Sequence, residues 1–253
     1  MKEDNNTRKD LGGLINPPNI ITCCNLISGC IATYWAFQGD HTMALAFIIL
    51  GAVFDFFDGM TARQLHIASP IGKELDSLAD DITFGFAPSA IVFKFLSDQY
   101  ASVHQQCLSP LQLPLLFTGG LASLVFVMAA FSALRLAKFN LDERQAMGFI
   151  GLPTPANALF WGSLIVGLEE KAIRFNGMEG CILVGTFISC YLLISEIPMF
   201  ALKFKTWGWK GNEIKYIFIL SCIPLLLLLG VSGLAAIIAW YILLSIITNK
   251  QSH

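Results

Sequence analysis

Charged residues are scarce in this sequence: Asp, Glu, Lys and Arg make up 13% of its 253 residues, whereas hydrophobic residues make up 55%. The mean hydropathy is +0.64. The apolar runs are too numerous and too long to be buried in one water-soluble core. The scarcity of charge therefore excludes a soluble protein and predicts an integral membrane protein. The net charge of −2 says little about partners, and no nucleic-acid partner is expected.

Cysteine and histidine show none of the spacings that are typical of metal sites. All seven Cys residues except Cys107 lie in apolar segments, so a disulfide framework is not expected. The four His residues form no cluster along the chain. The first 18 residues are polar and end in Pro17 and Pro18, so no cleavable signal peptide is expected. No internal repeat, low-complexity tract or separate soluble domain is evident.

Eight apolar segments predict an all-α integral membrane protein with about eight transmembrane helices. The predicted spans are 19–37, 41–65, 77–97, 113–136, 155–169, 180–200, 215–230 and 232–248. They form a single predicted transmembrane domain over 19–248, between cytoplasmic segments at 1–18 and 249–253. The fifth and seventh spans are short for a membrane crossing.

The distribution of positive charge predicts the orientation of these helices. With the N-terminus in the cytoplasm, most of the 16 Lys and Arg residues fall in cytoplasmic segments. Only Lys94, Lys171 and Arg174 fall outside, and the polar connection 98–112 contains neither Lys nor Arg. We therefore expect a multi-pass protein of the cell membrane, inner or plasma, whose motif-bearing side faces the cytoplasm.

Four aspartates lie at helical spacing near the cytoplasmic ends of two predicted spans. Asp55 and Asp58 are three residues apart, and Asp76 and Asp80 are four apart, so each pair shares one helix face. The short link between the helices predicts antiparallel neighbours whose carboxylates face each other. Such carboxylates suit hard divalent ions such as Mg²⁺ or Mn²⁺. The alternative is that these are ordinary solvated charges at helix ends. It is disfavoured, because an Asp costs roughly 2.5–3.5 kcal/mol at the bilayer centre and four together are not expected without a function.

The same region resembles a known family. Residues 55–80 match the pattern D-x2-D-G-x2-A-R-x8-G-x3-D-x3-D, the signature of the CDP-alcohol phosphotransferases, at every fixed position. The resemblance implies a CDP-linked donor, two divalent ions and a homodimer. It also implies that Asp58 bridges both ions and that Asp55 and Asp76 help to complete their coordination. Asp80, the last carboxylate of the set, is implied to be the general base as well as a ligand.

Four more positions of the signature are predicted to contact the CDP-lipid. Gly59 and Ala62 keep the helix surface small where a nucleotide approaches. Arg63 offers a planar fork of donors for a phosphate, and Gly72 is expected to open the next helix near the same headgroup. The alternatives are helix packing for Gly59 and Ala62 and membrane anchoring for Arg63. The family resemblance favours nucleotide contact.

The first predicted span opens with a polar stripe. Asn19, Thr22 and Asn25 recur every third residue at its cytoplasmic end. The pattern P-N-x-x-T-x-x-N resembles the entry of phosphatidylserine synthase-like members of the family, which implies contact with the CDP-lipid. Helix capping by Asn19 together with interhelical hydrogen bonds explains the stripe equally well.

Three later segments also resemble bacterial phosphatidylserine synthases: 80–89, 132–140 and 151–156. The resemblance implies transfer from CDP-diacylglycerol to L-serine, which gives phosphatidylserine and CMP. Arg135 and Lys138 share a helix face at the expected level of the site. With Asn140 nearby, they are predicted to bind the serine carboxylate or a lipid phosphate, and anchoring at the membrane surface is the alternative.

Two other functions stay open at this point. The nearer one is the same chemistry with glycerol phosphate or inositol as acceptor, because the basic residues near the site do not exclude a phosphorylated alcohol. A transporter or ion pathway is less favoured, because polar residues would then line a route across the whole bilayer. Here the acidic residues cluster at the cytoplasmic end, and the outer halves of the spans are almost wholly apolar.

Overall fold

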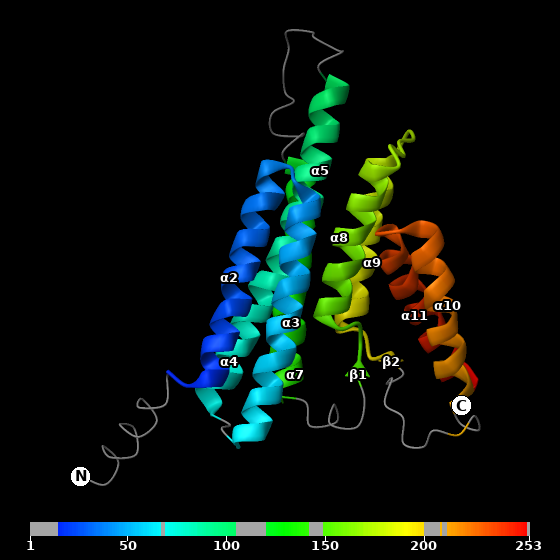
Figure 1. The fold of residues 1–253 in the computed structure, drawn as a ribbon. Coiled ribbons are helices and arrows are strands. Elements are labelled where there is room, and N and C mark those ends of the chain that lie inside the picture. The colour runs from blue at the N-terminus through cyan, green and yellow to red at the C-terminus, as the bar shows by residue number, and fades with distance from the viewer. Residues whose placement is uncertain are drawn as a thin grey trace.

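The computed structural model describes residues 15–66, 69–104, 120–141, 149–199, 208 and 212–251. Most of these residues belong to long helices that form an elongated bundle (Figure 1). The elements are α2 (Pro17–Gln38), α3 (His41–Leu65), α4 (Pro70–Asp80), the π-helix η1 (Asp81–Phe86), α5 (Ala87–His104), the 3₁₀ helix η2 (Leu124–Phe126), α7 (Val127–Leu141), β1 (Phe149–Ile150), α8 (Thr154–Glu170), α9 (Met178–Ile194), β2 (Pro198–Met199), α10 (Glu213–Leu229) and α11 (Ser232–Gln251).

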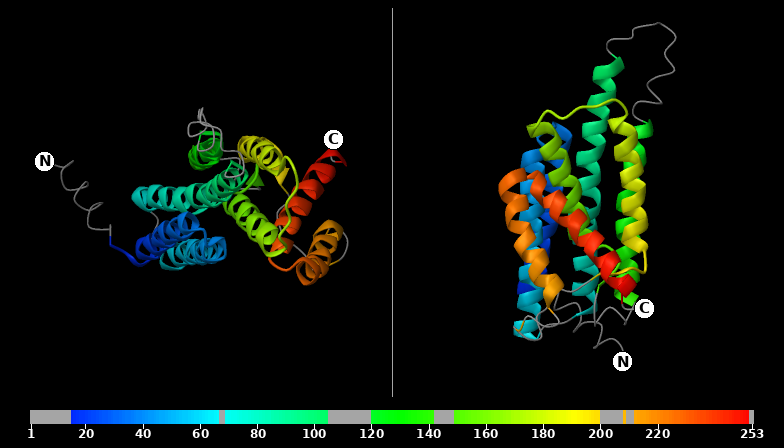
Figure 2. Two further views of the ribbon diagram at one scale, coloured as in Figure 1. Left: turned by 90° about the horizontal axis from the view of Figure 1, so that it is seen from above. Right: turned by 90° about the vertical axis from the view of Figure 1, so that its right-hand side faces the viewer.

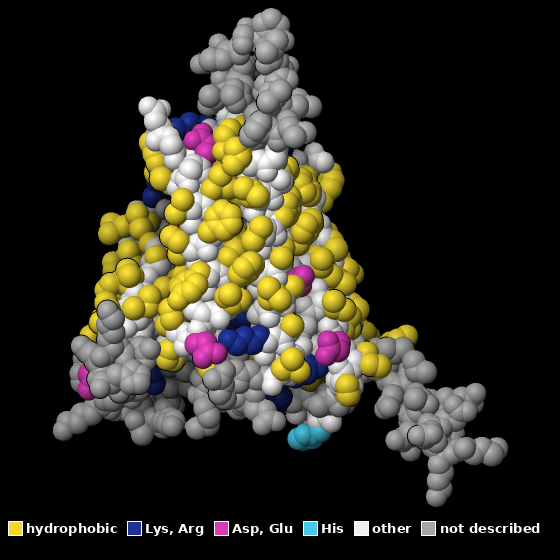
Figure 3. Space-filling view, turned by 180° about the vertical axis from the view of Figure 1, so that it is seen from behind, with side chains coloured by type: hydrophobic (Ala, Val, Ile, Leu, Met, Phe, Trp, Pro, Cys, Tyr) yellow, Lys and Arg dark blue, Asp and Glu magenta, His cyan; other side chains and the backbone are white. Residues whose placement is uncertain are grey.

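Length and composition support the prediction of a membrane protein. Within the described part of the chain, three helices are long and apolar enough to cross a membrane: Pro17–Gln38, His41–Leu65 and Gly120–Leu141. Met178–Ile194 and Ser232–Thr248 are shorter apolar helices. Hydrophobic side chains cover the middle of the molecule, and the charged side chains on this face lie mainly towards its two ends (Figure 3). The protein is therefore an all-α membrane protein. The number of its membrane spans, eight, stays a prediction.

The described helices follow the predicted spans with shifted ends. The third span, predicted at 77–97, lies inside a helical stretch that runs from Pro70 to His104. The last helix continues to Gln251, beyond the predicted boundary at 248. The sequence did not predict the two-residue antiparallel pairing of β1 with β2, in which Phe149 lies opposite Met199. The span predicted at 180–200 is too long at its end, because α9 stops at Ile194 and residues 195–199 are not helical. Residues 113–119 of the span predicted at 113–136 lie outside the described residues.

Capping residues explain where α2 begins and ends and where α3 begins. The Asn16 side chain accepts a hydrogen bond from the Asn19 N–H at 2.9 Å, and proline fills the first turn of α2. The helix ends at Gln38 and is capped by Gly39, whose φ of +84° suits glycine. Asp40 then caps α3 by accepting from the Met43 N–H at 2.9 Å. Asn16 is thus the cap of α2, and the interpretation of Asn19 as its cap is wrong.

The aspartate-bearing helix changes its hydrogen-bonding pattern directly after Asp80. It starts regularly, because the Ser69 hydroxyl accepts from the Gly72 N–H at 3.0 Å and Pro70 occupies the first turn. From Asp81 to Phe86 the backbone forms a π-helix, and α5 then continues in the α conformation. π-Helical turns are rare and are frequent at functional sites. This one separates the carboxylates of α4 from the packed part of α5.

The helix α2 packs against α3, α4 and η1, so it connects the two carboxylate-bearing segments. It approaches η1 closely at Gly29, where a Cβ would lie 2.8 Å from the Thr83 Cα. The Thr83 hydroxyl donates to the Asn25 carbonyl oxygen at 3.1 Å, which fixes the register of this contact. Glycine at position 29 therefore allows α2 to lie against η1.

Substitution of this glycine is expected to separate the two helices. In Gly29→Ala, the new methyl group would overlap the Thr83 backbone, and overpacking of this kind costs about 1–3 kcal/mol. The free energy of unfolding in detergent micelles should fall by that amount. Gly180→Ala on α9 is the matched control, because a Cβ added there would meet no atom of the described residues within 4 Å. Equal stability of the two variants would contradict this account of the α2–η1 contact.

The signature aspartates meet at one end of the bundle, the lower end in Figure 1. The helices α3 and α7 end there, and α4 and α8 begin there. Viewed along the bundle, α8 lies between the α2–α5 group and the α10–α11 pair (Figure 2). The bundle therefore brings residues that are distant in the sequence to one end, which is the end predicted to face the cytoplasm.

Candidate functional site

Three of the four aspartates form one cluster. Asp55 from α3 and Asp76 and Asp80 from α4 each offer a carboxylate oxygen, and these oxygens lie within 4.8 Å of one another. Asp80 is buried, and the other two are half-buried. The Asp76 Oδ1 atom is buried and has no hydrogen-bond partner among the described residues. Hard oxygen donors at this separation fit a divalent cation. The number and identity of the ions stay predictions.

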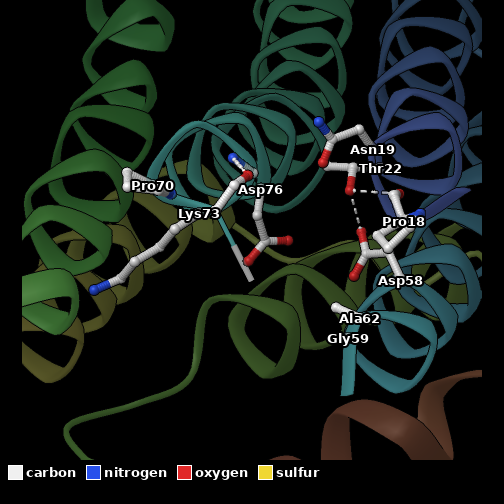
Figure 4. Close-up of a pocket in the computed structure, with 11 residues that line it drawn as sticks. Pro18, Asn19, Thr22, Asp58, Gly59, Ala62, Pro70, Lys73 and Asp76 are labelled. Atoms are coloured by element: carbon white, nitrogen blue, oxygen red, sulfur yellow. Dashed lines mark hydrogen bonds between the residues drawn. The ribbon is translucent and has the colours of Figure 1, made fainter. Parts of the chain in front are cut away.

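The fourth aspartate, Asp58, faces the adjoining cavity. Its Oδ2 atom accepts a hydrogen bond from the Thr22 hydroxyl at 2.7 Å, and the side chain is buried. Figure 4 shows the carboxylates of Asp58 and Asp76 directed towards the same space from opposite sides. Asp58 is not one of the residues whose carboxylate oxygens lie within 4.8 Å of one another. Its predicted role as a bridging ligand would require this side chain to bind the ions in addition to Thr22 or in its place, and it stays a prediction.

The polar stripe of α2 supports carboxylates on both neighbouring helices. Thr22 donates to Asp58 of α3, and the Asn25 side-chain amide donates to the Asp80 Oδ1 atom at 3.0 Å. Interhelical hydrogen bonding by the stripe is therefore confirmed. The bond from Asn25 also orients the Asp80 carboxylate, because it fixes one of its two oxygens. Contact of Asn19, Thr22 and Asn25 with a CDP-lipid stays a prediction.

A cavity of about 530 Å³ lies beside these carboxylates, within the size range of small-molecule sites. The lining residues come from the starts of α2 and α4, the segment before α4 and the end of α3: Pro18, Asn19, Thr22, Asp58, Gly59, Ala62, Ser69, Pro70, Gly72, Lys73 and Asp76. Five predicted CDP-lipid contacts are among them. A Cβ at Gly72 would lie 3.1 Å from the Asn19 Oδ1 atom, so glycine keeps this wall open. Arg63 is exposed and does not line the cavity.

The three predicted acceptor contacts differ in their positions. Arg135 is buried, with 7% of its surface exposed, and its Nη1 atom lies 3.4 Å from the Thr154 hydroxyl. Lys138 instead lies 3.3 Å from the Glu196 carboxylate. Asn140 donates from its side chain to the Ser77 hydroxyl at 2.8 Å, which ties the end of α7 to α4. Arg135 alone of the three is buried beside the carboxylate site, and all three stay predictions as substrate contacts.

Several polar residues near Arg135 were not predicted from the sequence. Asn157 on α8 is fully buried, as is Ser132 on α7. The available signal was the sequence spacing. Ser132 lies three residues before Arg135, and Asn157 lies three residues after Thr154, so each shares a helix face with another polar residue.

Comparison with known proteins adds independent evidence. The model of the family described as CDP-alcohol phosphatidyltransferase matches residues 15–191. A CDP-diacylglycerol–serine O-phosphatidyltransferase of Bacillus subtilis (strain 168) is 34% identical over 180 residues, which cover 71% of this chain and 87% of that protein. A protein with the same name from Helicobacter pylori (strain J99) is 29% identical over 251 residues, which cover 94% of this chain and 98% of the relative. A third, from Mycobacterium tuberculosis (strain H37Rv), is 27% identical over 195 residues, which cover 72% of this chain and 60% of that relative.

Proposed function

The chain belongs to the CDP-alcohol phosphatidyltransferase family, and we propose that it transfers the phosphatidyl group of CDP-diacylglycerol to the hydroxyl of L-serine. The products are phosphatidylserine and CMP. The observation that carries this proposal is the carboxylate cluster of Asp55, Asp76 and Asp80 beside a cavity at one end of an apolar bundle. The acceptor is inferred from the three relatives, which are all named as serine transferases.

The reaction requires one bond to form and one to break at the same phosphorus. The serine oxygen attacks the phosphorus that carries diacylglycerol, and the bond from that phosphorus to the CMP oxygen breaks. Divalent cations, when bound, neutralise the pyrophosphate and stabilise the charge that develops on the leaving CMP. The protein supplies no covalent nucleophile in this scheme, so its own residues bind, orient and accept a proton.

Asp80 is proposed to accept the proton of the serine hydroxyl. An alcohol is a weak nucleophile at neutral pH, and a carboxylate within hydrogen-bonding reach assists its attack. The hydrogen bond from Asn25 holds one Asp80 oxygen and leaves the other for cation or acceptor. The cavity between α2, α3 and α4 is proposed to hold the CDP group, with Gly59, Ala62 and Gly72 admitting it and Arg63 approaching its phosphates from the surface.

A panel of acceptors tests this function. The purified protein would be incubated with CDP-diacylglycerol, Mg²⁺ or Mn²⁺, and L-serine, glycerol 3-phosphate or inositol in separate reactions. We expect CMP release and a new phospholipid with serine, and only background with the other two alcohols. Turnover with glycerol 3-phosphate or inositol and none with serine would overturn the choice of acceptor while the donor chemistry stood.

The setting of the enzyme follows from the same proposal. We place the carboxylate end on the cytoplasmic side of the cell membrane, because most basic residues fall in the segments at that end. Residues 19–248 are proposed to act as one transmembrane domain with polar segments at 1–18 and 249–253. A homodimer is proposed from the family resemblance.

A further inference from the structure

A second group of buried polar side chains lies beside the carboxylates, where α7, α8 and η1 pack together. Its best-defined member is Arg135, whose guanidinium lies 3.4 Å from Thr154 and whose helix α7 packs against η1, the segment that begins directly after Asp80. The Arg135 Nε atom is buried and has no hydrogen-bond partner among the described residues. This group therefore lies beside the segment that follows the proposed general base, and none of its members lines the donor cavity.

Asn157 extends this group along α8. It follows Thr154 by three residues, so the two side chains lie on the same helix face, one turn apart. Asn157 is 0% exposed. Both polar atoms of its amide, Oδ1 and Nδ2, lack a hydrogen-bond partner within the described part of the chain. A buried polar group without a partner costs about 1–3 kcal/mol, so a fully buried and wholly unpaired amide points to a ligand that pairs it.

The chemistry of the side chains restricts what that ligand can be. A guanidinium only donates hydrogen bonds, whereas an amide donates from its nitrogen and accepts at its oxygen. A phosphate or a carboxylate alone would use the donors and leave the Asn157 oxygen unpaired. A free amino acid carries a carboxylate to accept and an ammonium group to donate, so it satisfies both kinds of atom. The position next to Asp80 suits an amino acid whose side chain carries the reacting hydroxyl.

We propose that Asn157, together with Arg135, binds the amino-acid end of the acceptor. Asn157 thereby determines specificity for a zwitterionic alcohol. The inference rests on the proposed serine transfer and assigns the acceptor site within it. The Arg135 guanidinium pairs with the carboxylate, the Asn157 amide pairs with both charged groups, and the hydroxyl is left facing Asp80. Glycerol phosphate and inositol carry no ammonium group, so they leave the Asn157 oxygen unpaired.

Kinetic constants of Asn157→Ala test the proposal. Hydrogen bonds to charged groups contribute about 1.5–3 kcal/mol, so the KM for serine should rise about 10- to 100-fold. The KM for CDP-diacylglycerol should not change. For ethanolamine, which lacks the carboxylate, the ratio of wild-type to variant kcat/KM should be smaller than for serine. Ser163→Ala is the matched control on the same helix, because that buried hydroxyl already donates to the Leu159 carbonyl oxygen at 2.6 Å.

Thermal unfolding gives a second readout that is independent of turnover. The wild-type protein with CMP and Mg²⁺ should gain stability when L-serine is added, and Asn157→Ala should not. Without serine the variant should be as stable as wild type or more so, since it loses an unpaired buried amide. If Asn157→Ala does not fold, Asn157→Ser, which keeps a smaller donor and acceptor, decides the question by the same two measurements.

The outcomes separate this inference from the proposed function. A folded Asn157→Ala enzyme with a wild-type KM for serine would overturn the inference and assign the amide to structural water, while serine transfer would stand. Absence of phosphatidylserine synthesis by the wild-type protein would overturn the proposed function itself. An equal rise in the KM for serine and for CDP-diacylglycerol would also overturn the inference, because it would indicate a general disturbance of the site.

Discussion

Asp76→Ala is expected to abolish turnover and, with it, the stabilisation of the protein by divalent cations. The side chain contributes one of three carboxylate oxygens that lie within 4.8 Å of one another, and its Oδ1 atom is unpaired among the described residues. A bound cation supplies several kcal/mol of charge stabilisation, so the rate should fall about 10³-fold or more. Chelation of the wild-type enzyme should have the same effect, and added Mg²⁺ or Mn²⁺ should restore activity.

The chain offers a close control for this experiment. Glu74→Ala removes an exposed carboxylate from the same helix, two residues away from Asp76. Its rate and its cation-dependent rise in unfolding temperature should match those of the wild-type protein. Full activity of the wild-type enzyme in excess chelator would exclude a divalent cation from the reaction.

Asp80→Asn should slow the chemical step while donor binding is largely retained. The substitution keeps the size of the side chain and an oxygen that can accept from Asn25, but it removes the base. General-base catalysis contributes about 10²–10⁴-fold, so the single-turnover rate should fall by at least about 10²-fold. The affinity for CDP-diacylglycerol should weaken much less, because Asp55, Asp58 and Asp76 remain. Both quantities should be measured on the same preparation.

Glu74→Gln is the matched control for Asp80→Asn. It neutralises an exposed carboxylate on the same helix, and its single-turnover rate should stay near that of wild type. If Asp80→Asn bound neither cation nor donor, Asp80 would be a ligand first and another group would have to serve as base. A near wild-type rate in Asp80→Asn would remove this residue from the mechanism.

Local sequence patterns predicted much of the fold and part of the site. The apolar segments predicted the positions of the helices, because each segment is long enough for its hydrophobic composition to be recognised. The spacing of Asp55, Asp76 and Asp80 predicted their cluster, because helical periodicity and a short connection leave few ways to arrange them. The neighbouring residues were predicted less completely. Spacing could not indicate that Asp58 bonds to Thr22, or that Asn16 rather than Asn19 caps α2.

Contacts between distant segments were beyond the reach of these patterns. Arg135 and Lys138 lie three residues apart on one helix, and periodicity treats them alike. The structure separates them, because Arg135 is buried beside Thr154 whereas Lys138 lies against Glu196. The partner in each case comes from a different helix or loop, so only the packed bundle could distinguish the two. The spacing of Asn157 was a signal, but its complete burial without a partner among the described residues could not be predicted for the same reason.

The π-helix η1 fixes how the two halves of the long helix are rotated relative to each other. A π turn holds more residues than the 3.6 of an α turn, and each added or removed residue rotates everything beyond it by about 100°. The face of α4 that carries Asp76 and Asp80 and the face of α5 that packs in the bundle are therefore in phase only because of this irregular segment. Deletion of a single residue between Asp81 and Phe86 would leave the sequence of the aspartate signature intact. In the folded protein, however, the carboxylates of α4 would be rotated away from their present orientation relative to α5.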